Sequence, residues 1–229
     1  LLNTDGVLSS ATDTGLKVGG MLENTRGSLS AAGAMSAKVV GASINNSGTL
    51  TSNLALTLNA GSLQNTQGSI QSAQSSVQLG VTSVLSNGSG GSIDAATDVN
   101  VQAGSLANSG GMRGANDANI AVGTALTNDG NVTAGRNTTI TAGSVQGGSA
   151  SVFGAGVQND GKLGGTGDLR MTVSGALVAN GTNLAAGNAT LQGASVDLSR
   201  SQTSAADVVV TATQGNVVTS KASVVTPGS

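Results

Sequence analysis

The stretch Leu126-Thr127-Asn128-Asp129-Gly130-Asn131-Val132-Thr133-Ala134-Gly135 contains the unit from which most of the chain is built. An aliphatic residue stands two positions before an asparagine, and a glycine follows that asparagine within three positions. A second aliphatic residue comes shortly afterwards and leads into a strand in which aliphatic and polar residues alternate. A unit that recurs at a nearly fixed spacing is typical of a solenoid or an array of repeats.

Eight further copies of the unit can be set against this one, at intervals close to twenty residues. One interval is out of step, and we interpret residues 145–156 as an irregular excursion, either a loop or a short extra coil pushed out of the stack. This excursion contains the only aromatic residue, Phe153, which is a candidate contact site if it is exposed and otherwise packs onto the core. The nine anchor asparagines are Asn3, Asn24, Asn46, Asn65, Asn87, Asn108, Asn128, Asn159 and Asn180.

Strands with period two follow the anchors, as in Leu54, Leu56 and Leu58 with polar residues between them. With 36 Gly and only one Pro, the composition disfavours helix and favours turns. One coil of this size buries too few aliphatic residues to offset its backbone entropy, so the coils must stack. We therefore predict an all-β fold, a right-handed parallel β-helix (β-solenoid) of about ten coils with a repeat of about 20 residues.

The anchor asparagines have a physical role in such a stack. Asparagine tolerates the left-handed backbone of a turn, and asparagines that lie above one another can form an amide ladder along the axis. The simpler alternative is that they are turn residues whose side chains face outward.

Charge and composition exclude several kinds of function. Charged residues make up 9% of the chain and the net charge is −2, which gives no field for attracting nucleic acid or an anionic membrane. The chain has no Cys, His, Tyr or Trp, so disulfides, thiolate or imidazole metal sites and a Ser-His-Asp triad are excluded. We therefore predict no catalytic, cofactor-binding or metal-binding residues, and no enzyme.

Two weaker alternatives rest on carboxylates. Asp129 and Asp160 each follow an anchor asparagine, and a carboxylate pair on one edge would be compatible with glycoside hydrolysis. Gly164-Gly165-Thr166-Gly167-Asp168 approaches a calcium-binding repeat, but its aspartate comes one residue early and no second copy stacks on it. Both stretches are also ordinary turn sequences.

The repeat changes near the end of the chain. From residue 194 onward, Ser195-Val196-Asp197-Leu198-Ser199-Arg200 keeps the strand but loses the anchor asparagine. We divide the chain into residues 1–193, with the first repeat type, and residues 194–229, where a second repeat type begins and continues the same β-helix.

Units such as Ala60-Gly61-Ser62-Leu63-Gln64-Asn65-Thr66-Gln67-Gly68-Ser69-Ile70 resemble the filamentous-haemagglutinin repeats of bacterial two-partner-secretion exoproteins. These exoproteins include large adhesins and the stalks of contact-dependent growth inhibition effectors. The stretch Leu198-Ser199-Arg200-Ser201-Gln202 resembles the second haemagglutinin repeat class of the same exoproteins. The resemblance implies a right-handed parallel β-helix, export through a dedicated outer-membrane transporter, and display at the surface of a Gram-negative bacterium.

The function expected from this resemblance is structural. Because the chain begins at Leu1 rather than Met, we take it as a segment of a longer secreted filament. We expect a rigid stalk that projects an adhesive or toxin domain, in contact-dependent growth inhibition, with the transporter as partner of the full-length protein. The alternative is an adhesin module that binds a receptor or glycan on a target cell directly. Neither nucleic-acid binding nor membrane insertion by this segment is expected.

Overall fold

In the computed structural model, which describes residues 1–226, the chain is all-β and contains no helix in that range. Parallel strands stack as a β-solenoid of about ten turns, with about 21 residues from one turn to the next. The predicted fold class is thereby confirmed. The chain divides into two compact units, unit 1 at Leu1–Gly114 and unit 2 at Ala115–Ser229.

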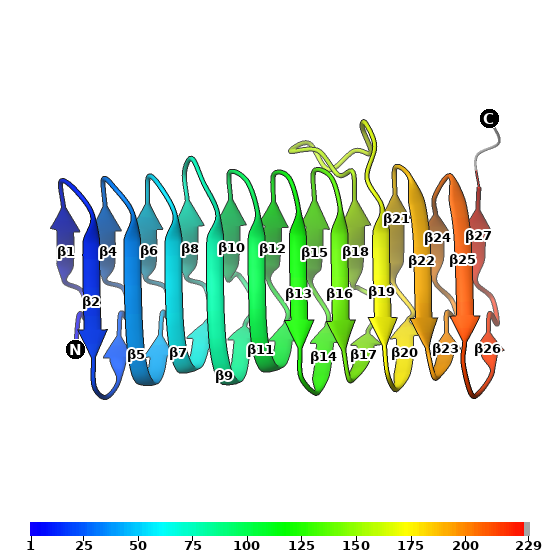
Figure 1. Cartoon of the computed structure of the whole chain (residues 1–229), viewed down its shortest axis with the longest axis horizontal. Helices are drawn as coiled ribbons and strands as arrows, with labels where there is room; N and C mark the ends of the chain where they lie inside the picture. Colours follow the sequence, from blue (N-terminus) through cyan, green and yellow to red (C-terminus); the bar gives the residue numbers. More distant parts are fainter. Residues whose placement is uncertain (227–229) are drawn as a thin grey trace. The chain divides into compact units, whose positions relative to one another are not determined.

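Unit 1 consists of two parallel sheets, and in Figure 1 the strands of the first lie behind those of the second. The first sheet has the order β1 (Val7–Ser10), β4 (Ser28–Ala31), β6 (Thr49–Ser52), β8 (Ser69–Ser72), β10 (Ser92–Ala95) and β12 (Gly111–Gly114). The second contains β2 (Thr14–Val18), β5 (Met35–Ile44), β7 (Leu56–Asn65), β9 (Val77–Asn87) and β11 (Val99–Asn108), and β3 (Leu22–Glu23) pairs with the end of β5.

Alternating side chains explain why the strands of unit 1 stack in register. In each strand every second residue faces the interior, and equivalent residues of successive coils lie directly above one another. Burying each such aliphatic side chain contributes about 1.5 to 3 kcal/mol. One interior column, with each member at most 1% exposed, consists of Leu29, Leu50, Ile70, Ile93 and Met112.

The long strands of the second sheet bend at a corner, where the pairing register shifts. In β7 the shift falls between Ala60 and Leu63. A Cβ atom on Gly61 would lie 2.7 Å from the Val40 carbonyl oxygen and 3.0 Å from that of Gly41. Glycine is therefore required at this corner, because the backbones of successive coils approach too closely for any side chain.

Unit 2 repeats the arrangement with shorter strands. Its first sheet contains β15 (Asn131–Ala134), β18 (Val152–Ala155), β21 (Thr182–Ala185), β24 (Gln202–Ser204) and β27 (Ser223–Val225). Where unit 1 has one long bent strand per coil, unit 2 has two. One row is β13 (Ala118–Val122), β16 (Thr138–Ala142), β19 (Leu169–Val173), β22 (Asn188–Gly193) and β25 (Asp207–Ala212), and the other is β14 (Ala125–Asn128), β17 (Ser144–Gly147), β20 (Ala176–Ala179), β23 (Ser195–Asp197) and β26 (Val217–Val218).

The irregular excursion of unit 2 lies later than the sequence indicated. Residues 144–155 form a regular coil, with β17 and β18 in register with their neighbours. The extra residues lie within 156–168, between β18 and β19, and extend beyond the strand ends in Figure 1. The two ends of this segment, Gly156 and Asp168, still hydrogen-bond to the neighbouring coil. An antiparallel bridge between Val157 and Leu163 closes this loop. The placement at 145–156 was therefore wrong, because the coil tolerates Gly147 where an asparagine was expected.

The predicted change of repeat type at residue 194 falls between β22 and β23, inside unit 2, and stays a prediction. No helix of the described residues is long and apolar enough to cross a membrane.

Candidate functional site

An asparagine ladder runs through the interior of unit 1. The side-chain nitrogen of each asparagine donates a hydrogen bond to the side-chain oxygen of the asparagine in the next coil, always in the same direction along the chain. The five bonds are Asn3 to Asn24 at 2.7 Å, and Asn24 to Asn45, Asn45 to Asn65, Asn65 to Asn87 and Asn87 to Asn108 at 2.8 Å each.

The second amide proton of these side chains is bonded to the backbone. Asn24 donates to the Thr49 carbonyl oxygen at 3.0 Å, and Asn65 donates to that of Ser92 at 3.1 Å. Both asparagines are 0% exposed. Since a buried amide without partners would cost free energy, the ladder is stable because both protons and the oxygen are bonded. It thereby fixes each turn to the start of a strand in the next coil.

The ladder uses Asn45 where the sequence analysis placed Asn46. Asn45 is 0% exposed and bonds to both neighbouring coils, whereas the Asn46 side-chain oxygen is buried without a hydrogen-bond partner in the described structure. The position is decided by the turn that follows. Ser47, two residues after Asn45, has a left-handed backbone with φ 53°, and a Cβ on Gly48 would collide with the Asn24 carbonyl oxygen.

Of the nine predicted anchors, the structure places Asn3, Asn24, Asn65, Asn87 and Asn108 in the ladder. The three anchors in unit 2 lie at different depths. Asn128 is buried and donates to the Val152 carbonyl oxygen at 3.3 Å, Asn159 is exposed in the excursion, and Asn180 lies in the turn after β20.

In unit 2 the interior position of Asn128 passes to Gly147 and then to Ala179 in the next two coils. The prediction that Asn159 and Asn180 continue a ladder was therefore wrong. Both match the local pattern, but the coil at 144–155 shifts the register of the anchors that follow it.

Phe153 is 0% exposed, so it packs in the core as the second of the two alternatives stated, and the alternative of a contact site at this residue was wrong. It continues the interior column of Val132 in the first sheet of unit 2. A Cβ on Gly147 would lie 2.9 Å from the ring atom Cε2 of Phe153 and 2.9 Å from Oγ of Ser151. The absence of a side chain at Gly147 therefore makes room for the largest side chain of the core.

A second buried polar contact lies in the column of Phe153, one coil further along the chain. Asn183 is 0% exposed, and its side-chain nitrogen donates to the Ala179 carbonyl oxygen and to Oγ1 of Thr203, each at 3.1 Å. The repeat pattern did not predict this contact, although Asn183 and Thr203 interrupt the aliphatic column at equivalent places.

The carboxylate alternatives lose their geometric basis. Asp129 precedes β15, whereas Asp160 lies in the excursion that follows the far end of β18, and these two strands are parallel neighbours. The two carboxylates therefore lie at opposite ends of the sheet. Asp160 is 3.7 Å from Nζ of Lys162, and no group of three or more His, Cys, Asp or Glu residues that could hold a metal ion occurs among residues 1–226.

A second ladder follows the outside of unit 2, where an Asp or Asn begins or directly precedes a strand in each coil. The Asp117 carboxylate accepts from the Asn137 backbone N–H at 3.1 Å, Asn137 Oδ1 accepts from that of Asp168 at 3.1 Å, and Asp168 accepts from that of Asn188 at 2.7 Å. Aspartate and asparagine alternate, so no two carboxylates occupy adjacent coils and like charges stay apart.

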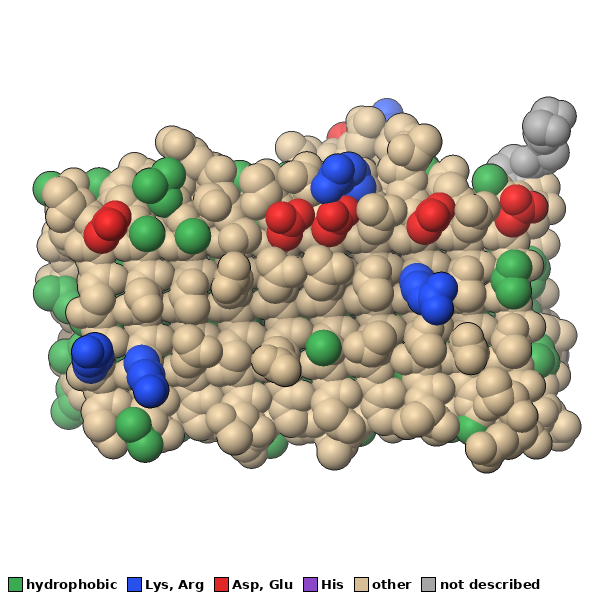
Figure 2. Space-filling view, viewed as in Figure 1, with side chains coloured by type: hydrophobic (Ala, Val, Ile, Leu, Met, Phe, Trp, Pro, Cys, Tyr) green, Lys and Arg blue, Asp and Glu red, His purple; other side chains and the backbone are tan. Residues whose placement is uncertain are grey.

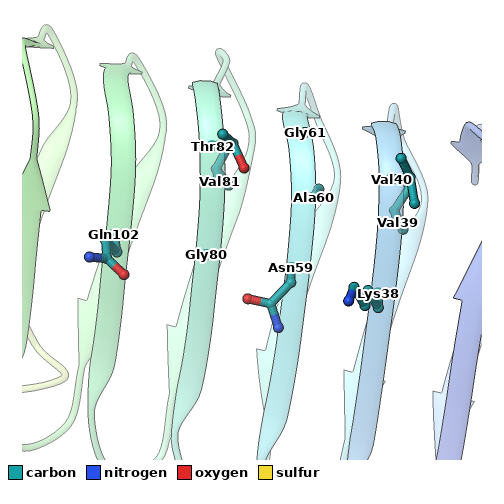
Figure 3. Close-up of a pocket in the computed structure, with 10 residues that line it drawn as sticks. All are labelled: Lys38, Val39, Val40, Asn59, Ala60, Gly61, Gly80, Val81, Thr82 and Gln102. Carbon is teal, nitrogen blue, oxygen red and sulfur yellow. The ribbon is translucent and has the colours of Figure 1, made fainter.

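Two surface clefts lie on the units, on a surface where most side chains are uncharged (Figure 2). The cleft of unit 1 crosses the outer face of β5, β7, β9 and β11 (Figure 3). Gly80 lies in register between Asn59 and Gln102, and its lack of a side chain leaves room for the cleft. The cleft of unit 2 lies over the turns after β17, β20 and β23.

The chain is similar to parts of two far longer proteins named CdiA. It is 48% identical over 80 residues to the toxin CdiA of Yersinia pestis, a match that covers 35% of this chain and 2% of that protein. It is 49% identical over 69 residues to the tRNA nuclease CdiA-2 of Burkholderia pseudomallei strain 1026b, which covers 30% of this chain and 2% of that protein. No protein-family model and no solved structure matches the chain.

Proposed function

We propose that this chain is a non-enzymatic structural segment of a contact-dependent growth inhibition protein. It acts as a stiff stalk that projects a toxin or adhesive domain from the surface of a Gram-negative bacterium. The similarity to two CdiA proteins supports the biological setting. The nuclease named in one of them belongs to that whole protein, of which the match covers 2%, and the proposal assigns no such activity to this segment.

The asparagine ladder is the observation that carries the stalk role. Five consecutive side-chain bonds, four of them buried, hold the coils of unit 1 in one register together with the backbone pairing. A coil that slid or tilted on its neighbour would leave buried amides unpaired, at about 1 to 3 kcal/mol each. This resistance gives a spacer that keeps its length under load.

The proposal includes the partners expected from the repeat sequence. In the full-length protein, a two-partner-secretion transporter exports the chain and the stalk is displayed at the cell surface. An adhesin module that binds a target cell directly is the second candidate, because the excursion at residues 156–168 interrupts an otherwise regular stack and extends beyond the strand ends.

A deletion series in the full-length protein tests the proposal. Deleting residues 65–86 joins Gln64 to Asn87 and removes one complete coil, so that Asn45 meets Asn87. We expect the protein to fold, to become shorter by about 4.8 Å, and to inhibit target cells with a graded dependence on the number of coils removed. The control deletion of residues 65–75 removes half a coil and should prevent folding of unit 1.

The stalk and adhesin roles give different results in this series. Loss of target-cell attachment on deleting residues 157–166 alone, with no effect of whole-coil deletions, would reject the stalk and support the adhesin. Inhibition that depends on coil number and survives loss of the excursion supports the stalk.

A further inference from the structure

The cleft of unit 2 arises from a difference in turn length. The turns that join β17 to β18 and β23 to β24 each contain four residues, 148–151 and 198–201, whereas the turn from β20 to β21 contains only Asn180 and Gly181. The short turn lies between the two long ones in the stack. A cleft therefore opens over it, lined by Gly148 and Ser149 on one side and by Arg200 and Lys221 on the other.

Two cations occupy equivalent turn positions at this cleft. Arg200 and Lys221 both have left-handed backbones, with φ 62° and 59°, and the Arg200 backbone N–H donates to the Ser220 carbonyl oxygen at 2.9 Å. Their coils are thus direct neighbours, about 4.8 Å apart along the stack. No salt bridge within residues 1–226 involves either side chain.

In unit 1, one pair of charged residues occupies the equivalent turn position in adjacent coils. Asp5 and Arg26 have the same left-handed conformation in adjacent coils, and they form a two-pronged salt bridge with both N···O distances at 2.7 Å. Opposite charges at this spacing attract, whereas like charges repel. The stacked Arg200 and Lys221 therefore lack a counter-charge that the same geometry supplies elsewhere.

A neutral polar group lies beside the two cations. Asn180 lines the cleft, and its side-chain oxygen is buried without a hydrogen-bond partner in the described structure. Because Asn180 lines the cleft and rotation about the terminal bond of its side chain costs little, this oxygen is available as an acceptor for a ligand there. The remaining side chains of the cleft are hydroxyls and an amide, with no carboxylate among them.

We infer that this cleft binds an acidic saccharide, with an oxyanion between Arg200 and Lys221 and a sugar hydroxyl on the side-chain oxygen of Asn180. Arginine supplies a planar fork for a carboxylate or phosphate, and lysine supplies a second positive charge. Because the only aromatic residue is buried at Phe153, no stacking surface contributes and hydrogen bonds carry the recognition. Both cations are exposed, so binding is weak and weakens further with salt. This site does not depend on the proposed stalk role.

Titration of the 229-residue chain, followed by backbone amide NMR shifts, tests the site. The probes are glucuronate, glucose 6-phosphate, inorganic phosphate and glucose. We expect both acidic sugars to shift amides of the turns at 148–151 and 198–201, and glucose to shift none. Glucuronate and glucose 6-phosphate distinguish a carboxylate from a phosphate ligand. Inorganic phosphate that binds as tightly as both acidic sugars would overturn the saccharide assignment.

Matched variants assign the contacts. The double substitution Arg200→Asn and Lys221→Asn keeps a residue that tolerates the left-handed backbone, and it should weaken binding of the acidic sugars at least about tenfold. The control Arg26→Asn removes the same charge at the same kind of turn in unit 1 and should leave binding unchanged. Asn180→Ala should weaken the acidic sugars but not inorganic phosphate.

Unchanged affinity in the double variant, or shifts of the wild-type chain that map outside the cleft, would overturn the inference. Circular dichroism checks that each variant is folded. If the double variant is not folded, the wild-type shift map and the two single variants decide.

Discussion

The asparagine ladder makes a quantitative prediction for Asn65→Ala. The Asn65 side chain is 0% exposed and takes part in three hydrogen bonds. Its oxygen accepts from Asn45 at 2.8 Å, and its nitrogen donates to Asn87 at 2.8 Å and to the Ser92 carbonyl oxygen at 3.1 Å. Alanine removes all three bonds and leaves partners on both neighbouring coils without water to replace them.

The magnitude follows from the number of groups left unpaired. A hydrogen bond contributes about 1 kcal/mol net, and a buried polar group without a partner costs about 1 to 3 kcal/mol. With a donor unpaired on one side and an acceptor on the other, we expect Asn65→Ala to lower the free energy of unfolding by about 3 to 6 kcal/mol. The matched control is Asn59→Ala in the same strand, where the side chain is exposed and the expected change is within about 0.5 kcal/mol.

Urea unfolding followed by far-ultraviolet circular dichroism gives the global effect. Because stacked repeats need not unfold in one step, amide hydrogen exchange of β7 and its neighbours gives the local one. The two readouts should agree that Asn65→Ala opens the coils on both sides of β7. Equal effects of Asn65→Ala and Asn59→Ala would refute the ladder as a source of stability.

Three further predictions concern unfolding in urea. Asn45→Ala should cost about as much as Asn65→Ala and Asn46→Ala less than about 1 kcal/mol, because only Asn45 bonds to both neighbouring coils; the reverse order would favour the sequence-based register. Gly147→Ala should crowd the Phe153 ring, and Phe153→Leu should leave a cavity that lowers the free energy of unfolding by about 1 to 3 kcal/mol. The double variant should therefore lose less stability than the sum of the two single losses, and strict additivity would show that the two sites are independent. Burial raises the pKa of Asp94 above 3.8, so its contribution to stability is full below that pH and is lost as the pH rises through the raised pKa. The stability of Asp94→Asn relative to the wild type should therefore increase as the pH rises over that window. Parallel curves of stability against pH would contradict this.

The fold was predictable from the sequence because each coil repeats the same alternation. Aliphatic residues at every second position indicate a strand that is buried on one side. Because the unit repeats about every twenty residues, stacked coils can cover that side with the equivalent residues of their neighbours. Leu50, Ile70 and Ile93 lie in the interior column for this reason, each at 0% exposure.

The register of individual residues was harder to predict, because a short pattern can be met twice. Both Asn45 and Asn46 lie close behind the aliphatic Ile44, and Asn46 alone satisfies the spacing of two. The structure shows that the spacing to the glycine is the better signal. Gly48 follows Asn45 by three residues, and it must be glycine because the carbonyl oxygen of Asn24 occupies the place of a Cβ.

The position of the excursion depended on packing that no local pattern reports. Val157 and Asn159 reproduce the repeat unit and yet lie in the loop, because the coil before them is complete without an asparagine. Gly147 and Phe153 compensate each other in volume within that coil. Such compensation between residues of one coil is visible only once the strands have been placed.

The uniform direction of the asparagine ladder has a consequence for how the chain folds. From Asn3 to Asn87 each amide donates towards the coil that follows it in the sequence, so a completed coil presents an unfilled donor to the residues that come after it. An asparagine at the matching position of the incoming segment can accept that bond and donate the next. Each finished coil is therefore a template that sets the register of its successor, and growth can proceed from the amino end before the rest of the chain has arrived.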